Sequence, residues 1–276
     1  MQVSVCFPYY HGYPGQGERS FDEAYDLLRR EHQRVARIQV TNPEMRTLIL
    51  ETGIAADKVH TILIGVDSAA FSVATPDQRV AVRRRLGIPQ SAVVIGSFQK
   101  DGNGWGEGLE PKHIKGPDVL LKALVLLKET IPELFVLLSG PARGFVRRGL
   151  ESAGIPHRHT LAASHAGVPP LFHALDAYIV ASREEGGPKS ILESMASGVP
   201  IISTRVGQAP ALIRHGENGW LTDVADAEAL AHFTLKSLAG DWLPAYRRVA
   251  RQTAEENDYL TQSPQWLAFF NGLLAR

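Results

Sequence analysis

The chain has 276 residues with 44% apolar content, which is enough for one large domain or two smaller ones with a proper core. It carries 29 Lys and Arg residues against 29 Asp and Glu residues, so no global field gathers nucleic acid or an anionic membrane. The lone Cys6 excludes an intramolecular disulfide framework and a Cys-based zinc site, and it favours a reducing compartment.

No apolar run approaches the ~20 residues that a membrane span needs, and the N-terminus lacks a basic region followed by an apolar stretch. We therefore expect a cytoplasmic protein, with a peripheral contact at the inner membrane face left open. The balanced charge favours a small-molecule site in which a charged ligand is held locally, and we expect no nucleic-acid partner.

Residues 1–72 show alternating strand and helix patterns. Short apolar runs predict strands at 3–7 and 36–40. Ser20 and Glu23 form a capping-box pattern that predicts the start of a first helix. Asn42 followed by Pro43 predicts the start of a second helix. The order is β-α-β-α.

The same alternation resumes from about residue 93 with cleaner apolar strands, separated by helices. Such a pattern predicts a parallel sheet covered on both faces, with ligands beyond the carboxyl ends of the strands. We expect a doubly wound domain over 73–255 and a C-terminal segment, 256–276, that packs back on the first 72 residues. The predicted strands are 93–98, 134–140, 177–182, 200–204 and 219–222, and the predicted helices are 118–130, 171–175, 189–197, 226–238, 244–257 and 264–274.

Two carboxylates, Glu185 and Glu193, flank a Gly-Gly-Pro loop after the strand predicted at 177–182. Pro188 suits the first position of a helix, whose free N-terminal amides form a ready anion site. Glu193 lies about one and a half turns further on, roughly 7 Å along the axis, which matches the span from a phosphate to the ribose of a nucleotide. The amides expected to face the anion are those of Lys189, Ser190 and Ile191.

Other interpretations of this stretch are also open. Glu-Gly-Gly-Pro is an ordinary turn sequence, and an exposed helical Glu is usually a solvated surface residue. A second feature supports the site: Lys115 stands before another Gly-Pro helix start, and a parallel sheet brings such loops to one edge. A solvated surface lysine is the alternative for Lys115 by itself.

Metal and nucleophile motifs are weak in this sequence. There is no phosphate-loop motif, no Gly-x-Gly-x-x-Gly after a strand, no Gly-x-Ser-x-Gly elbow and no Asp-x-Asp. His157, His159 and His165 have no zinc spacing, and we expect them at the surface of a polar loop. We predict no metal site.

At this point the residues resemble the C-terminal half of retaining glycosyltransferases of family 4, which have the GT-B fold. The resemblance covers about Gln39 to Leu230 and is highly specific between Ala177 and Leu221. It rests on Glu185-x7-Glu193 followed by Ser-Met-Ala-Ser-Gly-Val-Pro, on Val206-Gly207, on Gly65-Val66-Asp67 with Phe71, on Lys115-Gly116, and on His215-Gly-Glu-Asn-Gly219.

The resemblance implies transfer of a sugar from a nucleoside diphosphate sugar, with retention of configuration and with no required metal or cofactor. It assigns Glu193 to the ribose, Glu185 to the donor sugar and Lys115 to the diphosphate. The family's Arg after the first strand of this domain is Ser97 here, and Lys100 is the cation expected to substitute. Further expected donor-site residues are Gly186, Gly187 and Gly207, and His11 stands near where a pocket His is expected.

The first 72 residues are shorter than the N-terminal domain of such enzymes, which supplies much of the acceptor site. We therefore expect a GT-B-like protein with a truncated N-terminal α/β portion. Three functions stay open: a transferase in polysaccharide, glycolipid or small-glycoside synthesis, a sugar-nucleotide-binding module or partner-dependent inactive subunit, and an epimerase on the same fold. The acceptor is unknown.

Overall fold

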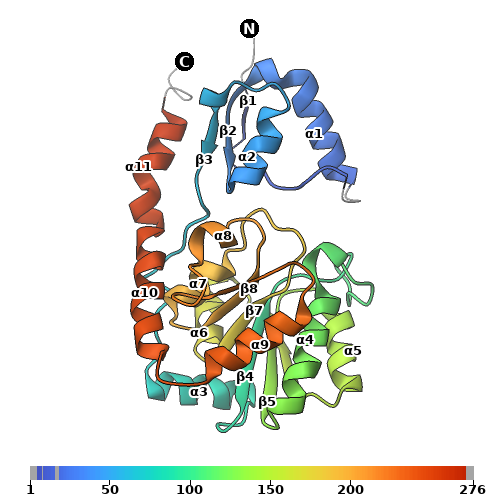
Figure 1. Cartoon of the computed structure of the whole chain (residues 1–276), viewed down its shortest axis with the longest axis vertical. Helices are drawn as coiled ribbons and strands as arrows, with labels where there is room; N and C mark the ends of the chain where they lie inside the picture. Colours follow the sequence, from blue (N-terminus) through green and yellow to red (C-terminus); the bar gives the residue numbers. More distant parts are fainter. Residues whose placement is uncertain (1–4, 8, 16–18, 272–276) are drawn as a thin grey trace.

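Two parallel β-sheets, one small and one large, organise the chain (Figure 1). The computed structural model describes residues 5–7, 9–15 and 19–271. The small sheet has the order β1-β2-β3 and the large one the order β6-β5-β4-β7-β8-β9, with every neighbouring pair parallel. The strands are β1 (Val5–Phe7), β2 (Val35–Val40), β3 (Val59–Thr61), β4 (Val93–Phe98), β5 (Leu134–Ser139), β6 (His157–Thr160), β7 (Ala177–Val180), β8 (Ile201–Thr204) and β9 (Trp220–Thr222).

The strand order of the large sheet reverses between β4 and β7. From β4 the chain builds outward through β5 and β6, then returns to the other side of β4 and builds outward through β7, β8 and β9. In doubly wound sheets the crevice for a ligand opens at this reversal, beyond the carboxyl ends of the strands. The loops after β4 and β7 are therefore the ones that the topology places at a binding site.

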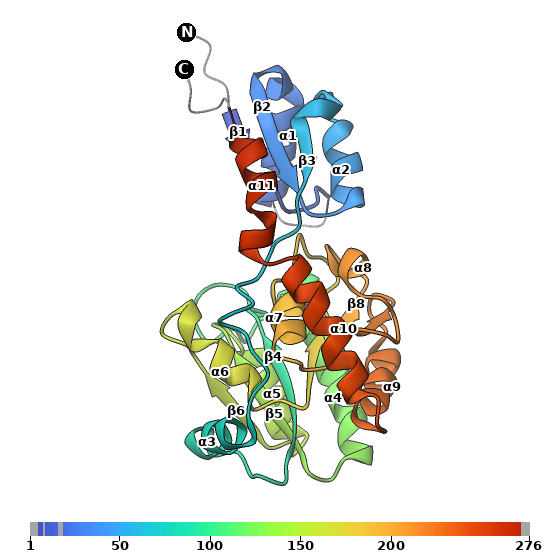
Figure 2. The same ribbon diagram turned by 90° about the vertical axis from the view of Figure 1, so that its left-hand side faces the viewer.

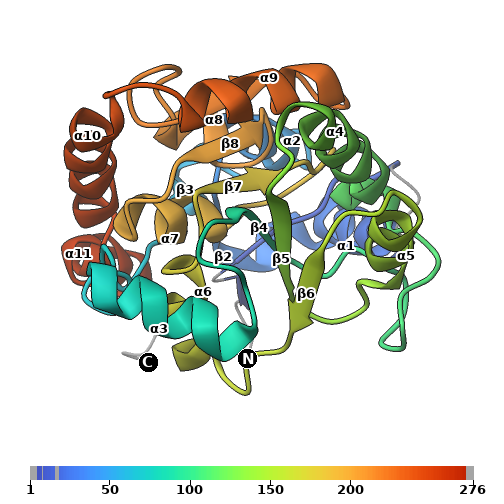
Figure 3. The same ribbon diagram turned by 90° about the horizontal axis from the view of Figure 1, so that it is seen from below.

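Helices cover both faces of the large sheet, as Figure 3 shows. Neighbouring strand residues alternate between two cores: Val94 and Tyr178 pack toward one face, and Ile95 and Ile179 toward the other. The helices are α3 (Pro76–Leu86), α6 (Pro169–Phe172), α7 (Ser190–Ala196) and α8 (Ala209–Leu212) on the first side, and α4 (Pro117–Thr130), α5 (Gly144–Ser152) and α9 (Ala227–Leu238) on the second. The prediction of a doubly wound α/β fold is confirmed.

The small sheet packs against α1 (Arg19–Glu31) and α2 (Pro43–Leu50) around its own apolar core. The start predicted for α2 is confirmed, because Asn42 Oδ1 accepts a hydrogen bond of 2.8 Å from the Met45 amide. The capping box predicted at Ser20 is wrong: Ser20 lies within α1, and the Glu23 carboxylate binds Arg19 instead.

Two long helices, α10 (Leu243–Glu256) and α11 (Tyr259–Phe270), lead from the large sheet to the small one (Figure 2). Arg37 on β2 donates to the carbonyl oxygens of Ala268 and Phe269, and the Phe269 ring meets His60 edge-on at 5.2 Å. The last helix begins five residues before the predicted start at Pro264, since Asp258 caps it. The domain limits at 72, 73 and 255 stay a prediction.

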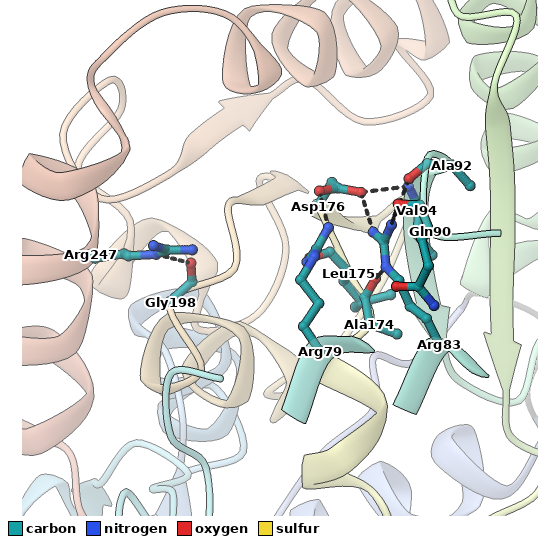
Figure 4. A network of polar contacts seen from close by, with 10 residues as sticks. All are labelled: Arg79, Arg83, Gln90, Ala92, Val94, Ala174, Leu175, Asp176, Gly198 and Arg247. Carbon is teal, nitrogen blue, oxygen red and sulfur yellow. Dashed lines mark hydrogen bonds and ion pairs between the residues drawn. The ribbon is translucent and has the colours of Figure 1, made fainter. Parts of the chain in front are cut away.

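A buried arginine fastens α3 to the amino ends of β4 and β7, on the side of the large sheet opposite the crevice (Figure 4). Arg83 binds Asp176 at 2.7 Å and donates to carbonyl oxygens of the turn before β4 and of the segment before β7. Asp176 also accepts from the Val94 amide and pairs with Arg79. Helix α3 carries few apolar residues, so this network adds to the packing of Val82 and Leu86 in anchoring the helix.

Among the described strands and α-helices, five were not predicted: β3, β6, α3, α5 and α8. Strand β6 contains His157 and His159, for which we had expected a polar loop. That expectation is wrong, because β6 pairs only with β5 at the edge of the sheet, where polar side chains reach solvent. The ring of His159 binds the Gly140 carbonyl oxygen at 2.7 Å.

Candidate functional site

The loops after β4 and β7 enclose a cavity of about 470 Å³ at the carboxyl edge of the large sheet. This volume is within the range of small-molecule sites, about 300–1,000 Å³. The cavity lies at the strand reversal between β4 and β7, where a doubly wound sheet binds its ligands. The predicted site residues in its wall are Lys100, Lys115, Glu185, Gly187, Lys189, Ser190 and Glu193.

Lys115 and Glu185 form an ion pair in the cavity wall. The Lys115 ammonium lies 2.7 Å from Glu185 Oε2, and the Ser182 hydroxyl donates to Glu185 Oε1 at 2.8 Å. The carboxylate is therefore fixed from both sides. An ammonium has three donors, so its bond to Glu185 leaves two for another anion in the cavity.

The backbone at Gly116 places Lys115 beside the end of β7. Lys115 ends a 3₁₀ turn, His113–Lys115, and Gly116 then adopts φ +60° before Pro117 opens α4. A Cβ at Gly116 would lie 1.9 Å from the Ala181 carbonyl oxygen. Only glycine allows α4 to approach β7 this closely.

Gly116→Ala should destabilise the fold much more than Gly154→Ala. Both glycines have left-handed φ values, +60° and +63°, but no atom of the described residues lies within 4 Å of a Cβ at Gly154. The left-handed conformation costs roughly 1–2 kcal/mol in either variant, and the clash at Gly116 adds about 1–3 kcal/mol. Urea unfolding measures both values, and equal losses would contradict the close approach to Ala181.

Glu193 is buried in the cavity floor, with 7% of its surface exposed. Its Oε1 lies 3.0 Å from Nε2 of His165, which belongs to a 3₁₀ turn, His165–Gly167. Burial raises the pKa of the Glu193 carboxyl, and the hydrogen bond from His165 opposes that rise. His165 lies at the surface as expected, with 57% of its side chain exposed, and the structure adds a contact that orients the Glu193 carboxylate.

The helix after the Gly-Gly-Pro loop starts slightly later than predicted. Helix α7 begins at Ser190, with Lys189 at the N-cap position. The Ile191 amide donates to the Pro188 carbonyl oxygen at 3.3 Å, so the expectation that this amide faces an anion is wrong. The amides of Lys189 and Ser190 belong to the first turn, where a helix supplies no partner of its own.

Gly186 faces the small sheet and not the cavity. Its carbonyl oxygen accepts hydrogen bonds from Thr41 and Asn42, which directly follow β2. A Cβ at Gly186 would lie 2.7 Å from Cβ of His11, so this histidine stands on the outer side of the loop. The segment after β2 of the small sheet thus holds the loop that carries Glu185 in place.

His11 stacks on Tyr9 with 4.8 Å between the ring centroids. Burial and the nearby Lys115 ammonium lower the pKa of His11, while Glu185 acts in the opposite direction. The ring is therefore close enough to the Lys115–Glu185 pair to feel both charges, although it does not line the cavity that contains Glu193.

Gly207 lies beneath the same loop rather than in the cavity wall. A Cβ there would be 2.6 Å from the Gly186 carbonyl oxygen and 2.7 Å from that of Glu185. Gly207 lines a second cavity of about 500 Å³, which shares Glu185 with the first. Gly207 therefore allows the loop after β8 to pack closely against the loop that carries Glu185.

A buried arginine at the N-cap of α5 stands beside Ser97, where the resembling family has its Arg. Arg143 donates to the Ser97 carbonyl and hydroxyl oxygens and pairs with Asp101 at 3.1 Å, with both charged side chains fully buried. Nothing in the local sequence around Arg143 indicated this contact. The Arg143 guanidinium is enclosed and is therefore not part of the cavity wall. The cationic side chains in that wall are Lys100, Lys115 and Lys189.

Within the described residues, no group of three or more His, Cys, Asp or Glu side chains is placed to hold a metal ion. Among the helices of the same residues, none is long and apolar enough to cross a bilayer.

The two α/β portions and the charged cavity between the loops after β4 and β7 define a GT-B fold, which comparison with solved structures supports. The structure of HepE from Anabaena in complex with UDP and glucose superposes with a TM-score of 0.79 at 20% identity, over 98% of this chain and 72% of that one. Residues 109–256, just over half of the chain, match the family Glycosyl transferases group 1, and the chain belongs to this family.

Curated relatives are longer than this chain. A D-inositol 3-phosphate glycosyltransferase of Corynebacterium urealyticum is 26% identical over 250 residues, which are 84% of this chain and 55% of the relative. The lipopolysaccharide core biosynthesis mannosyltransferase LpsB of Rhizobium meliloti is 26% identical over 61% of this chain and 47% of its own length. The chain spans about half the length of these relatives.

Proposed function

We propose that the protein transfers a sugar from a nucleoside diphosphate sugar to an acceptor, with retention of anomeric configuration. The observation that carries this proposal is one cavity, at the strand reversal, that contains a buried carboxylate, Glu193, and a fixed ion pair, Lys115 with Glu185. Membership of the group 1 family supports it.

Each of these side chains matches one part of such a donor. Glu193 accepts hydrogen bonds from the two ribose hydroxyls, Lys115 and Lys100 bind the diphosphate, and Glu185 contacts the sugar. Glu193 suits its role because His165 holds one oxygen and leaves the rest of the carboxylate to a ligand.

The chemistry follows from charge. Negative charge grows on the diphosphate as the glycosidic bond breaks, so preplaced ammonium groups bind the departing group more strongly than the intact donor and lower the barrier. The leaving phosphate takes the proton of the acceptor hydroxyl on the same face. The lysines supply the positive charge, so the proposal includes no metal.

Glu193→Ala should abolish stabilisation by the matching nucleotide. Thermal unfolding with UDP, GDP, ADP, CDP and TDP identifies the base, and UDP is the first choice because the similar HepE was solved with it. Ligand at about 100 times its dissociation constant adds roughly 2.7 kcal/mol. Glu228→Ala, an exposed glutamate on α9, is the control and should respond like the wild type. A shift retained in Glu193→Ala would refute the assignment.

A second function, binding of a sugar nucleotide without transfer, is favoured by one specific observation. Ser97 replaces the family's Arg, and the neighbouring Arg143 is buried, so the diphosphate would lose a bidentate partner. The isolated chain distinguishes the two functions: release of sugar or transfer from the bound donor supports the enzyme, and nucleotide binding with neither product supports the binding module.

A further inference from the structure

The loop between β4 and α4 is much longer than the two to six residues usual for such a connection. It occupies residues 99–116 and carries four glycines at alternate positions, from Gly102 to Gly108. In Figure 1 it projects above α5, at the edge of the large sheet that faces the small one. A loop of this length at a binding edge is usually functional.

The base of this loop is fixed. Gly102 pairs with Pro111 in an antiparallel bridge, and the Gly144 amide at the start of α5 donates to the Glu107 carbonyl oxygen at 2.7 Å. A Cβ at Gly102 or Gly108 would lie 2.5 or 2.2 Å from the Ala142 carbonyl oxygen. These two glycines therefore let both arms of the loop pack against the large domain.

The tip of the loop is open and presents Trp105. Within the part of the chain that the structure describes, no atom lies within 4 Å of a Cβ at Gly104 or Gly106, and Trp105 is 82% exposed. Such exposure of an indole is unfavourable in water, and Trp is enriched where a ligand covers it. The Lys100 ammonium lies 3.9 Å from the centre of the Trp105 ring and also lines the cavity. The indole thus contacts a residue of the cavity wall through this lysine.

We propose that Trp105 is a stacking platform for a sugar ring of the acceptor. The inference rests on the proposed transfer function and names the substrate class on its acceptor side, a glycan or glycoside. The electron-rich face of an indole attracts the weakly positive C–H groups of a pyranose, as it attracts the Lys100 ammonium. The fixed loop base holds the indole next to Lys100, in the wall of the cavity that would hold the donor.

The test is ligand-observed NMR on the whole chain saturated with UDP, with maltose, cellobiose and N,N′-diacetylchitobiose as probes. At least one disaccharide should receive saturation from the wild-type protein. Trp105→Ala should weaken its binding about fivefold or more, Trp105→Phe should restore part of it, and UDP affinity should change less than twofold. Leu260→Ala, which removes an equally exposed apolar side chain on α11, is the control.

Each outcome decides a separate point. Unchanged disaccharide binding in Trp105→Ala, or no binding of any probe to the wild type, would overturn the platform. A parallel loss of UDP affinity in Trp105→Ala would also overturn it and assign the indole to the nucleotide. Trp105-dependent sugar binding by a chain that binds no nucleotide would support the platform and refute the donor site.

Discussion

Lys115→Ala is expected to lower kcat for sugar transfer by about 10²–10³-fold, the loss usual when one group that stabilises developing negative charge is removed. The Lys115 ammonium is fixed at 2.7 Å from Glu185 at the end of a 3₁₀ turn, so its position does not depend on the donor. UDP affinity should fall about 10- to 100-fold, as expected for loss of a charged hydrogen bond. UMP, which lacks the second phosphate, should be affected less.

Lys122→Ala is the matched control for Lys115→Ala. Lys122 lies on α4, seven residues beyond Lys115, and it also pairs with a carboxylate, Glu228, at 2.6 Å. The side chains of Lys122 and Glu228 are both more than half exposed, so this ion pair contributes little to the free energy of folding. Steady-state kinetics and calorimetric titration measure both variants. Equal losses in the two variants, or a Lys115→Ala chain whose preference for UDP over UMP equals that of the wild type, would remove Lys115 from the diphosphate site.

Arg83→Met is expected to lower the free energy of unfolding by about 3–5 kcal/mol, since it removes one partner of a buried ion pair. Arg83 is 2% exposed, and its guanidinium binds Asp176 together with the carbonyl oxygens of Ala174, Gln90 and Ala92 (Figure 4). Met keeps much of the volume and none of these bonds. The carbonyl oxygens of Ala174 and Ala92, whose hydrogen bonds to Arg83 are buried, would lose a donor, and so would one oxygen of Asp176.

Arg84→Met is the matched control on the same helix. Arg84 is the next residue of α3 and is exposed, so the same chemical change should alter the free energy of unfolding by no more than about 0.5 kcal/mol. Urea titration followed by circular dichroism compares the two variants. Similar losses in both would show that the Arg83 network does not fasten α3 to the sheet.

Much of the fold follows from local sequence. The strand at Val93–Phe98 has the predicted bounds, and Asp226 caps the helix that ends at Leu238 as predicted. In both places the signal lies within a few residues: a continuous apolar run for a buried strand, and a capping side chain before an apolar helix. The polar edge strand at His157–Thr160 lacks that signal. It pairs with one neighbouring strand and its polar side chains reach solvent, so it forms without a continuous apolar run.

The candidate site likewise combines features that local sequence predicts with features that only the tertiary structure decides. The sequence by itself determined the side chains that carry charge, since Lys115, Glu185 and Glu193 stand at fixed spacings around two Gly-Pro helix starts, and the structure gathers all three in one cavity. Only the tertiary structure decided their partners. His165 meets Glu193 from 28 residues away, and Thr41 holds the Gly186 carbonyl oxygen from 145 residues away. Such contacts depend on how the strands are ordered in the sheets, and no local pattern of residues encodes that order.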